Sequence, residues 1–429
     1  MHYEKFQDGT VKCIEDEIPF EVPEGWSWAR LRDICMMSAG KSKSTVQIKS
    51  EPFEGSYPCF GGNGVRGYVD EYNQDGIFSI VGRQGALCGN INIAIGKFYA
   101  TEHAVVTTLF DGIDFKWSNY ILEALRLNNY ATGAAQPGLS VANILNVFVP
   151  VPPTQEQDRI GNNVYESLKI VEALEQEKID LQKNIITAKT KILDLAICGK
   201  LVPQDPNDEP ASVLLERIRA EKEELIKHGK IKRDKKESVI FKGDDNSYYG
   251  IHLPDSWNWA SLREIALSIS DGSHNPPPNN GSGIPLLSAA NINDNSILMN
   301  EISRWITNEE WKIENQRTNI EVGDVLLTIV GSIGRSAVVQ NNNHFALQRS
   351  VAVIKPCLIN PLYLMHIVQS PQIQKWLTDN SKGTAQKGIY LNALSLMIIP
   401  IPPLAEQARI VELIHIAYKQ LDLISNALL

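Results

Sequence analysis

The feature that most constrains the fold of this chain is an internal repeat. The segment Pro23-Glu-Gly-Trp-Ser-Trp-Ala-Arg-Leu-Arg-Asp-Ile34 returns 231 residues later as Pro254-Asp-Ser-Trp-Asn-Trp-Ala-Ser-Leu-Arg-Glu-Ile265. Because two tryptophans in matching register are improbable by chance, we expect two copies of one domain. A length of 429 residues is sufficient for two or three domains, each with its own core.

Further motif pairs follow the tryptophan motif in the same order in both copies. They are Ile80-Val-Gly-Arg-Gln-Gly85 with Ile329-Val-Gly-Ser-Ile-Gly334, Gly133-Ala-Ala-Gln-Pro-Gly138 with Gly383-Thr-Ala-Gln-Lys-Gly388, and Pro150-Val-Pro-Pro-Thr-Gln-Glu-Gln-Asp-Arg-Ile160 with Pro400-Ile-Pro-Pro-Leu-Ala-Glu-Gln-Ala-Arg-Ile410. The last pair is 250 residues apart, so the second copy is longer by 19 residues. We expect the extra residues between the tryptophan motif and the Ile-Val-Gly motif.

Each copy begins with short apolar or alternating runs and then changes to a helical period. Gly76–Val81 and Asp324–Val330 are typical of strands, and turns rich in glycine and asparagine separate such runs. After each Pro-Pro pair, apolar residues step by threes and fours, from Ile160 to Leu195 and from Ile410 to Leu428. The pattern predicts an α+β fold, with two β-rich domains in tandem pseudo-repeat separated by long antiparallel coiled-coil-like helices.

The predicted helices differ in length. The first is expected from Thr154 to Cys198, ended by Gly199, whereas the second starts after Pro403 and runs toward Leu429. Since an apolar stripe that faces only solvent is unfavourable, we expect the two helices to pack together, roughly antiparallel, between the domains. The alternative is that each helix packs on its own domain.

The expected organisation has five parts. They are a first β-rich domain over 1–153, a central long helix over 154–200, a linker with a charged helix over 201–240, a second β-rich domain over 241–403 and a short distal helix over 404–429. Within the linker, the prolines of 202–210 favour an exposed bend, and the basic run 230–236 is more typical of a solvated linker than of a binding patch.

Composition limits the function classes. The chain has 41 Lys plus Arg against 50 Asp plus Glu, a formal net charge of −9, so DNA binding would need a local basic face. A charged start and the absence of any apolar run of about 18 residues argue against secretion and membrane spanning. The six cysteines form no C-x-x-C pair, which favours reduced thiols in a cytoplasmic protein.

Motifs for catalysis or metal binding are incomplete. Ser38-Ala-Gly-Lys-Ser42 has Cys35 where a phosphate-binding loop needs its first glycine, and Asn275-Pro-Pro-Pro278 has a proline where a base-flipping methyltransferase has an aromatic ring. The eight histidines make no H-x₃-H or H-E-x-x-H pair. We therefore predict no catalytic residues, no metal site and no cofactor in this chain, and a role in binding.

In its order of motifs the chain resembles the specificity (S) subunit, HsdS, of type I restriction-modification systems. The resemblance spans essentially the whole chain. Its pieces are the two tryptophan motifs, the Gly-x-Ala-Gln-x-Gly loops, the two Pro-Pro helices, Tyr57-Pro-Cys-Phe-Gly-Gly-Asn-Gly-Val-Arg-Gly-Tyr68, Gly199-Lys-Leu-Val-Pro-Gln-Asp-Pro206, Asp271-Gly-Ser-His274 and Gly283-Ile-Pro-Leu-Leu287. One departure is the distal helix, which stops 26 residues after Pro403 whereas many family members have two helices of similar length.

The resemblance implies a DNA-binding subunit without catalysis of its own. Each β-rich domain would be a target recognition domain that reads one half of a bipartite sequence in double-stranded DNA, and the helices would hold the domains apart and dock two methyltransferase (M) subunits. In such systems S-adenosylmethionine belongs to the M subunits, and ATP and Mg²⁺ belong to restriction (R) subunits, two of which could also join this chain. A repeated protein with a spacer suits two successive major-groove sites.

Base readout requires side chains that donate and accept hydrogen bonds, carried on loops. The alternative for each candidate is an ordinary polar surface or turn-stabilising residue. In the first copy we expect DNA contacts from Lys41, Lys43, Arg66, Tyr68, Arg83, Gln84, Gln136 and Ser140, and in the second copy from His274, Asn275, Ser332, Arg335, Gln386, Lys387 and Tyr390.

Two further groups have competing interpretations. The paired tryptophans could stack on nucleotides, but tryptophans that alternate before an apolar strand favour a core role. The matched helix starts could have a capping or surface role or could contact an M subunit, and the sequence does not decide between these roles. The residues concerned are Trp26, Trp28, Trp257 and Trp259 in the first group, and Glu156, Gln157, Arg159, Glu406, Gln407 and Arg409 in the second.

Two other classes of protein compete with this prediction. A protein–protein scaffold with two β-rich binding domains would explain the repeat without DNA. A fused DNA-modifying enzyme would methylate or cleave as a single chain, but methyltransferase and helicase motifs are missing from the sequence.

Overall fold

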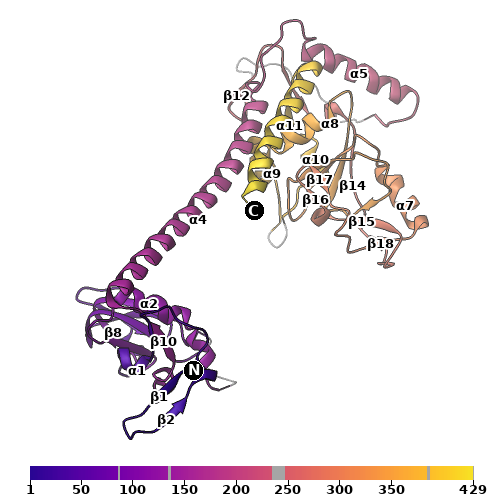
Figure 1. The fold of residues 1–429 in the computed structure, drawn as a ribbon. Helices are drawn as coiled ribbons and strands as arrows, with labels where there is room; N and C mark the ends of the chain where they lie inside the picture. The colour runs from indigo at the N-terminus through magenta and orange to yellow at the C-terminus, as the bar shows by residue number, and fades with distance from the viewer. Residues whose placement is uncertain (86, 134–136, 234–246, 384–386, 429) are drawn as a thin grey trace. The chain divides into compact units, whose positions relative to one another are not determined.

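The computed structural model describes residues 1–85, 87–133, 137–233, 247–383 and 387–428 (Figure 1). The chain divides into two compact units, Met1–Glu177, hereafter unit 1, and Lys178–Leu429, hereafter unit 2. The long helix α4, Thr154–Ile197, contributes its first part to unit 1 and its last part to unit 2.

Unit 1 is built on a six-stranded sheet in the order β4-β9-β7-β8-β5-β6. All neighbours are antiparallel except β5 and β8, which run parallel. The strands are β4 (Cys35–Ala39), β5 (Tyr57–Gly61), β6 (Gly64–Val69), β7 (Gln74–Gly82), β8 (Ile91–Ala100) and β9 (Ala104–Leu109). Val81 and Val105 pack in one cluster and Ile80 and Val106 in another, so both faces of the central strands are buried.

The remaining elements of unit 1 are short. They are the hairpin β1 (Tyr3–Lys5) and β2 (Val11–Cys13), the pair β3 (Ser27–Arg30) and β10 (Phe148–Val151), the helices α1 (Leu31–Ile34), α2 (Phe115–Ala124) and α3 (Val141–Ile144), and three short 3-10 helices, Glu15–Glu17, Thr45–Gln47 and Leu127–Tyr130. Leu31, Trp117, Leu122 and Ile144 are buried together with Val81, so these helices cover one face of the sheet.

Unit 2 contains smaller sheets. A four-stranded antiparallel sheet has the order β14-β22-β19-β20, and a three-stranded sheet has the order β18-β15-β21. The strands are β14 (Ala266–Asp271), β22 (Val351–Pro356), β19 (Val325–Thr328), β20 (Ser336–Val338), β18 (Trp305–Ile306), β15 (Ile284–Leu287), β21 (Ala346–Leu347), β13 (Asn258–Ser261), β23 (Ile398–Ile401), and the hairpins β11 (Ser247–Tyr248) with β12 (Ile251–His252) and β16 (Ile292–Asn293) with β17 (Ser296–Ile297).

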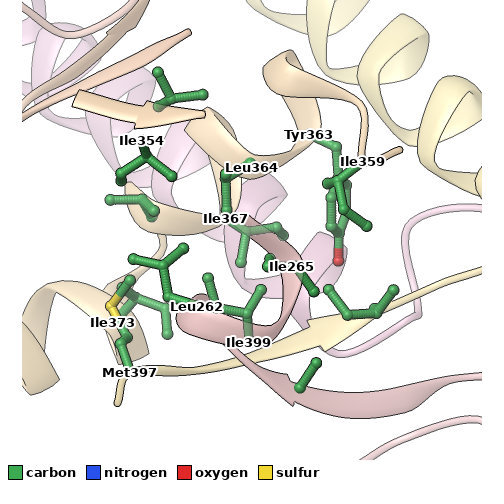
Figure 2. Close-up of a cluster of buried hydrophobic side chains, with 14 of the residues drawn as sticks. Leu262, Ile265, Ile354, Ile359, Tyr363, Leu364, Ile367, Ile373, Met397 and Ile399 are labelled. Carbon is green, nitrogen blue, oxygen red and sulfur yellow. The ribbon is translucent and has the colours of Figure 1, made fainter. Parts of the chain in front are cut away.

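Helices supply much of the core of unit 2. They are α5 (Ala211–Lys227), α6 (Leu262–Ile265), α7 (Asn308–Thr318), α8 (Pro361–Val368), α9 (Pro371–Asp379), α10 (Leu391–Leu394) and α11 (Leu404–Ala427). Figure 2 shows Leu262, Ile354, Ile367 and Tyr363 as members of this core. The Tyr363 hydroxyl donates to the carbonyl oxygen of Pro400 at 2.8 Å, which satisfies the polar end of a fully buried ring. The predicted α+β class is confirmed.

The tryptophan motifs and Pro-Pro motifs form the same two-stranded pairing in both units. In unit 1, Trp28 of β3 lies opposite Pro150 of β10, and in unit 2, Trp259 of β13 lies opposite Pro400 of β23. Trp257 and Trp259 are 2% and 4% exposed, as the core interpretation predicted. Trp26 and Trp28 are half-buried, and Trp28 packs edge-on against Phe20 and Phe148.

Hydrogen bonds correct one expected motif pairing. The Arg83 amide donates to the carbonyl oxygen of His103 and its carbonyl accepts from the Leu139 amide; in unit 2, Ile329 makes the same two bonds with Ser350 and Ile389. Arg83 therefore corresponds to Ile329, not to Ser332. Strand pairing sets register, and a short apolar triplet does not. Of the 19 extra residues in the second copy, 15 lie before Ile329 and four lie between Ile329 and Ile389. Not all of them therefore lie where the sequence predicted, before the Ile-Val-Gly motif.

The long helices have the predicted positions. The helix expected from Thr154 to Cys198 is α4, and the distal helix is α11. Within unit 2 the end of α4 lies beside α11 and runs antiparallel to it (Figure 1). Lys189 donates to Asp422 at 2.6 Å, and its carbonyl oxygen accepts from the Tyr418 hydroxyl at 3.2 Å. α11 also packs against α8 of its own unit, so both expected arrangements contribute.

The apolar stripe of α4 is covered at both ends, with Ile160 packed against the core of unit 1, and its middle is exposed. Ile185, Leu193 and Ile197 are buried, whereas Leu168 and Leu174 are 50% and 59% exposed. A part of the stripe is thus exposed among the described residues. No helix in the described ranges is both long and apolar enough to cross a membrane.

The segment expected as a linker is in part a packed element. Helix α5 matches the predicted charged stretch, but Leu214, Leu215 and Ile218 on it are buried in the core of unit 2. Arg219 forms an ion pair with Glu264 of α6 at 2.6 Å. The sequence predicted the helix but not its buried face, because charged residues dominate the composition of this stretch.

Candidate nucleic-acid interface

In unit 1, several candidate residues lie where strands of the six-stranded sheet end. The Gly40 amide donates to the carbonyl oxygen of Ala104, and the Lys41 amide donates to that of Ala100, both at 3.0 Å. A Cβ on Gly40 would lie 2.1 Å from the Ala100 oxygen, so only glycine permits this approach. Lys41 is held at the end of β4 with its side chain exposed.

Two neighbouring turns lie at the same strand ends as Lys41. The Arg83 amide donates to the carbonyl oxygen of His103 at 2.9 Å, and the Arg83 Nε donates to that of Leu139 at 3.3 Å. Gln84 forms a β-bridge with Gly138. The fold thus brings Arg83, Gln84 and Ser140, the residue after Leu139, to the same end of the strands of the sheet, as the base-readout hypothesis requires.

Strand β6 carries the next two candidates. Arg66 is exposed and its aliphatic part lies over Gly61, where an added Cβ would be 3.1 Å from Arg66 Cδ. Tyr68 is half-buried, and its backbone bridges to Lys49. Arg66 is therefore better placed than Tyr68 to reach a ligand with its polar group.

Lys43 differs from the other candidates because it already has partners. Its ammonium group donates to Glu71 at 2.6 Å, lies 3.9 Å from Asp70, and sits over the Tyr99 ring. The hydrogen bond to Glu71 raises the pKa of Lys43. Its side chain is only 7% exposed, so the structure favours the alternative of a turn-stabilising residue.

Unit 2 repeats the first of these arrangements with other side chains. The Gly272 amide donates to the carbonyl oxygen of Val351 and the Ser273 amide to that of Leu347. A Cβ on Gly272 would again lie 2.1 Å from a carbonyl oxygen, that of Leu347. The following residues, His274 and Asn275, are exposed.

A hydrogen bond to Asp271 orients His274. Its Nε2 lies 2.8 Å from Asp271, and the same carboxylate pairs with Arg317 of α7. Asp271 is 7% exposed, so this bond ties the exposed imidazole to a buried anchor. An imidazole restrained in this way loses less conformational entropy when it binds a ligand.

The turn after β19 and the start of α10 supply the other candidates of unit 2. Ser332 and Arg335 are exposed in the turn, and Gly331 joins that turn to Lys387 through a 3.1 Å backbone bond. Lys387 is exposed, and Tyr390, at the N-cap of α10, is 71% exposed. Gln136 and Gln386 lie outside the described residues.

Sequence reasoning missed two turns that the fold adds to these strand ends. In unit 1 it is the turn after β8, with Glu102 and His103, and in unit 2 it is the turn after β21, with Gln348 and the exposed Arg349. The Ser273 carbonyl accepts from the Arg349 amide at 2.9 Å. Neither turn contains glycine, so the search for glycine-bearing loops passed over them.

The helix starts expected at a subunit interface contain two buried glutamines. Gln157 accepts from the Asp114 amide and donates to the Pro152 carbonyl, and Gln407 does the same with Asn360 and Pro402. Asp114 and Asn360 are the N-caps of α2 and α8. Both glutamines use their polar atoms within the chain, so the structure favours an internal structural role over contact with an M subunit, and among the described residues no side-chain cap bond forms at the start of α11.

The other four residues of the helix starts differ between the units. Glu406 is buried, and burial raises its pKa; Arg409 pairs with Asp208, which raises the pKa of that guanidinium. The equivalent Glu156 is half-buried and Arg159 is exposed. Arg159 is thus more open to a partner than Arg409, whose guanidinium already pairs with Asp208.

Among the described residues, one group of three could offer ligand atoms to a metal: His2, Glu15 and Glu21, whose atoms lie within 4.8 Å of one another. The two glutamates are exposed, and Glu15 already accepts from the His2 amide, which lowers the pKa of its carboxyl. We assign no metal to it.

Comparison with known proteins identifies the family. Residues 23–191 and 254–428 match the model described as type I restriction modification DNA specificity domain. The chain belongs to this family. The two matches correspond to the two copies of the repeat, and specificity subunits of the family are non-catalytic, with catalysis in the M and R subunits.

Similar proteins include specificity subunits from Escherichia coli. The chain is 24% identical to the type I restriction enzyme EcoEI specificity subunit, over 99% of this chain and 83% of that protein. Identity to the EcoAI subunit is 34%, over 67% of this chain and 59% of that protein. Identity to the EcoprrI subunit is 45%, but the match spans only 34% of this chain and 36% of that protein.

Two solved structures share the fold. The HsdS subunit from Thermoanaerobacter tengcongensis has a TM-score of 0.55 at 18% identity and covers 96% of this chain and 93% of its own. A chain from a structure on complex assembly and conformational transition of the type I R-M system has a TM-score of 0.55 at 17% identity, covering 96% and 94%. At these identities the likeness concerns the fold. The family assignment itself favours DNA recognition over the protein–protein scaffold.

Proposed function

We propose that this specificity subunit directs a type I restriction-modification complex to a bipartite DNA sequence. The recognition domains over 1–153 and 241–403 each read one half of the target. The chain acts in the cytoplasm and contributes no catalysis.

The observation that carries this proposal is the repeated strand-end loop. Gly40–Lys41 and Gly272–Ser273 have the same backbone hydrogen bonds and the same close approach to a carbonyl oxygen, yet different side chains follow them. Two recognition domains that bind different half-sites need the same backbone support with different side chains to contact the bases.

Charge distribution supports the same role. The chain carries a net charge of −9, but Lys41 and Arg83 lie at strand ends of unit 1 and Arg66 is exposed on β6, while Arg349 and Lys387 lie on turns of unit 2. Local cations can hold phosphates while acidic residues elsewhere limit non-specific attraction. Partner subunits would then supply part of the electrostatic clamp on DNA.

We assign the docking of two M subunits to the helical region of the chain. The exposed apolar residues of α4, among them Leu168 and Leu174, support an interface along this helix. S-adenosylmethionine would be held by the M subunits, and ATP with Mg²⁺ by R subunits where these join the complex.

The test is methylation mapping of genomic DNA from cells that express this chain with its M subunit, compared with cells that express the M subunit alone. We expect a bipartite methylated motif that depends on this chain. If no such motif appears while the same M subunit methylates DNA with another specificity subunit, the proposal is wrong.

A further inference from the structure

The start of each long helix lies beside the first tryptophan of the repeat, and the two units treat this position differently. In unit 2, Trp257 Nε1 donates to Glu406 at 2.9 Å. In unit 1, the equivalent Trp26 Nε1 is enclosed by protein but has no hydrogen-bond partner among the described residues. A buried donor without an acceptor is unfavourable, so the difference calls for a physical cause.

The cause lies in the segment that follows α4. Gln204 donates to Glu406 at 2.6 Å and accepts from the Ser256 hydroxyl at 3.0 Å, which holds the carboxylate of Glu406 over the Trp257 ring nitrogen. Four residues further on, Asp208 pairs with Arg409. Residues 199–211 therefore act as a strap across the helix start of unit 2, and the Gln204 amide and the Asp208 carboxylate are its side-chain contacts to that helix.

Unit 1 carries the receiving side of the same arrangement. Trp26, Glu156 and Arg159 occupy the positions of Trp257, Glu406 and Arg409, and both tryptophan amides donate to the proline three residues earlier. Among the described residues, none forms a hydrogen bond or an ion pair with the side chain of Glu156 or Arg159. We define Trp26, Glu156 and Arg159 as the strap site of unit 1.

We propose that the strap site of unit 1 binds an extended, proline-containing segment of another polypeptide that carries a glutamine and, four residues later, a carboxylate. The glutamine amide donates to Glu156 and turns its carboxylate toward Trp26 Nε1, and the acidic residue pairs with Arg159. Complementary charge and the occupied counterpart in unit 2 both favour this chemistry. The proposal does not depend on DNA recognition.

The test uses the full chain and a fluorescent synthetic peptide of the sequence 199–211, GKLVPQDPNDEPA. Fluorescence anisotropy should show saturable binding to one site per chain. Arg159→Ala in the chain, or Asp208→Ala in the peptide, should each weaken binding roughly tenfold or more, and the two changes together should weaken it little further. Lys169→Ala, an equal loss of charge at an exposed position of α4, should leave the affinity unchanged.

A second readout distinguishes the site from the strap of unit 2. Peptide binding should shift the Trp26 indole N–H resonance, assigned by Trp26→Phe, because that group gains an acceptor. Absence of binding would overturn the proposal. Binding that is lost in Arg409→Ala but retained in Arg159→Ala would also overturn it, because the peptide would then be replacing the chain's own strap.

Discussion

At the scale of single residues, exposed cations on short turns carry the proposed DNA contacts. Arg349 is the clearest case, because its side chain is exposed and its backbone is tied to the Gly272–Ser273 loop. Lys43 is the contrary case, since two carboxylates already balance its charge. Residue type alone did not separate the two.

Arg349→Ala should weaken target binding by the complex with M subunits and make its salt dependence shallower by about one unit in a plot of log affinity against log salt concentration. Lys227→Ala, at the end of α5, serves as the control with the same loss of charge. An unchanged salt dependence for Arg349→Ala would show that this residue does not contact the DNA.

A buried histidine predicts a pH dependence of stability. His366 is 7% exposed, and burial lowers its pKa to about 4. In the unfolded chain this histidine takes up a proton near pH 6.5, whereas in the folded chain it does so only near pH 4. The free energy of unfolding therefore falls by at most about 3 kcal/mol as the pH decreases from about 6.5 to 4.

We expect urea unfolding of His366→Gln to show a smaller loss of free energy between pH 7 and pH 4 than the unsubstituted chain. A parallel decline in both proteins would assign the acid sensitivity to other groups.

At the scale of secondary-structure elements, the long helices are anchored by one glutamine each. Gln157 links the start of α4 to α2, and Gln407 links the start of α11 to α8. The Pro-Pro turns lack amide hydrogens, so a side chain must provide the bonds that orient the helix.

Gln407→Ala should lower the free energy of unfolding by about 2 kcal/mol, since the Asn360 amide and the Pro402 carbonyl both lose a buried partner. Gln420→Ala, exposed on the same helix, should change it by less than about 0.5 kcal/mol. Chemical denaturation of both variants measures the difference; equal effects would deny Gln407 its anchoring role.

At the scale of the whole molecule, the repeat separates two recognition tasks. The units have their own sheets and their own hydrophobic cores, and the predicted reading loops belong to one unit or the other. Energetic independence of this kind allows one domain to change without the other.

Replacement of residues 23–153 by the corresponding domain of another specificity subunit should change one half of the methylated motif and leave the other half intact. Methylation mapping measures both halves in one experiment. A change in both halves would show that the domains do not read DNA independently.

The sequence by itself determined the duplication, the α+β class, both long helices and the family, because repeated motifs, a period change and Pro-Pro helix starts are local signals. Tertiary structure decided the rest. Strand pairing showed that Arg83 corresponds to Ile329. Packing placed one face of the charged helix α5 in the core of unit 2, and the sheets placed turns such as that of Arg349 beside the predicted loops. These outcomes depend on contacts between residues distant in sequence, which local patterns do not encode.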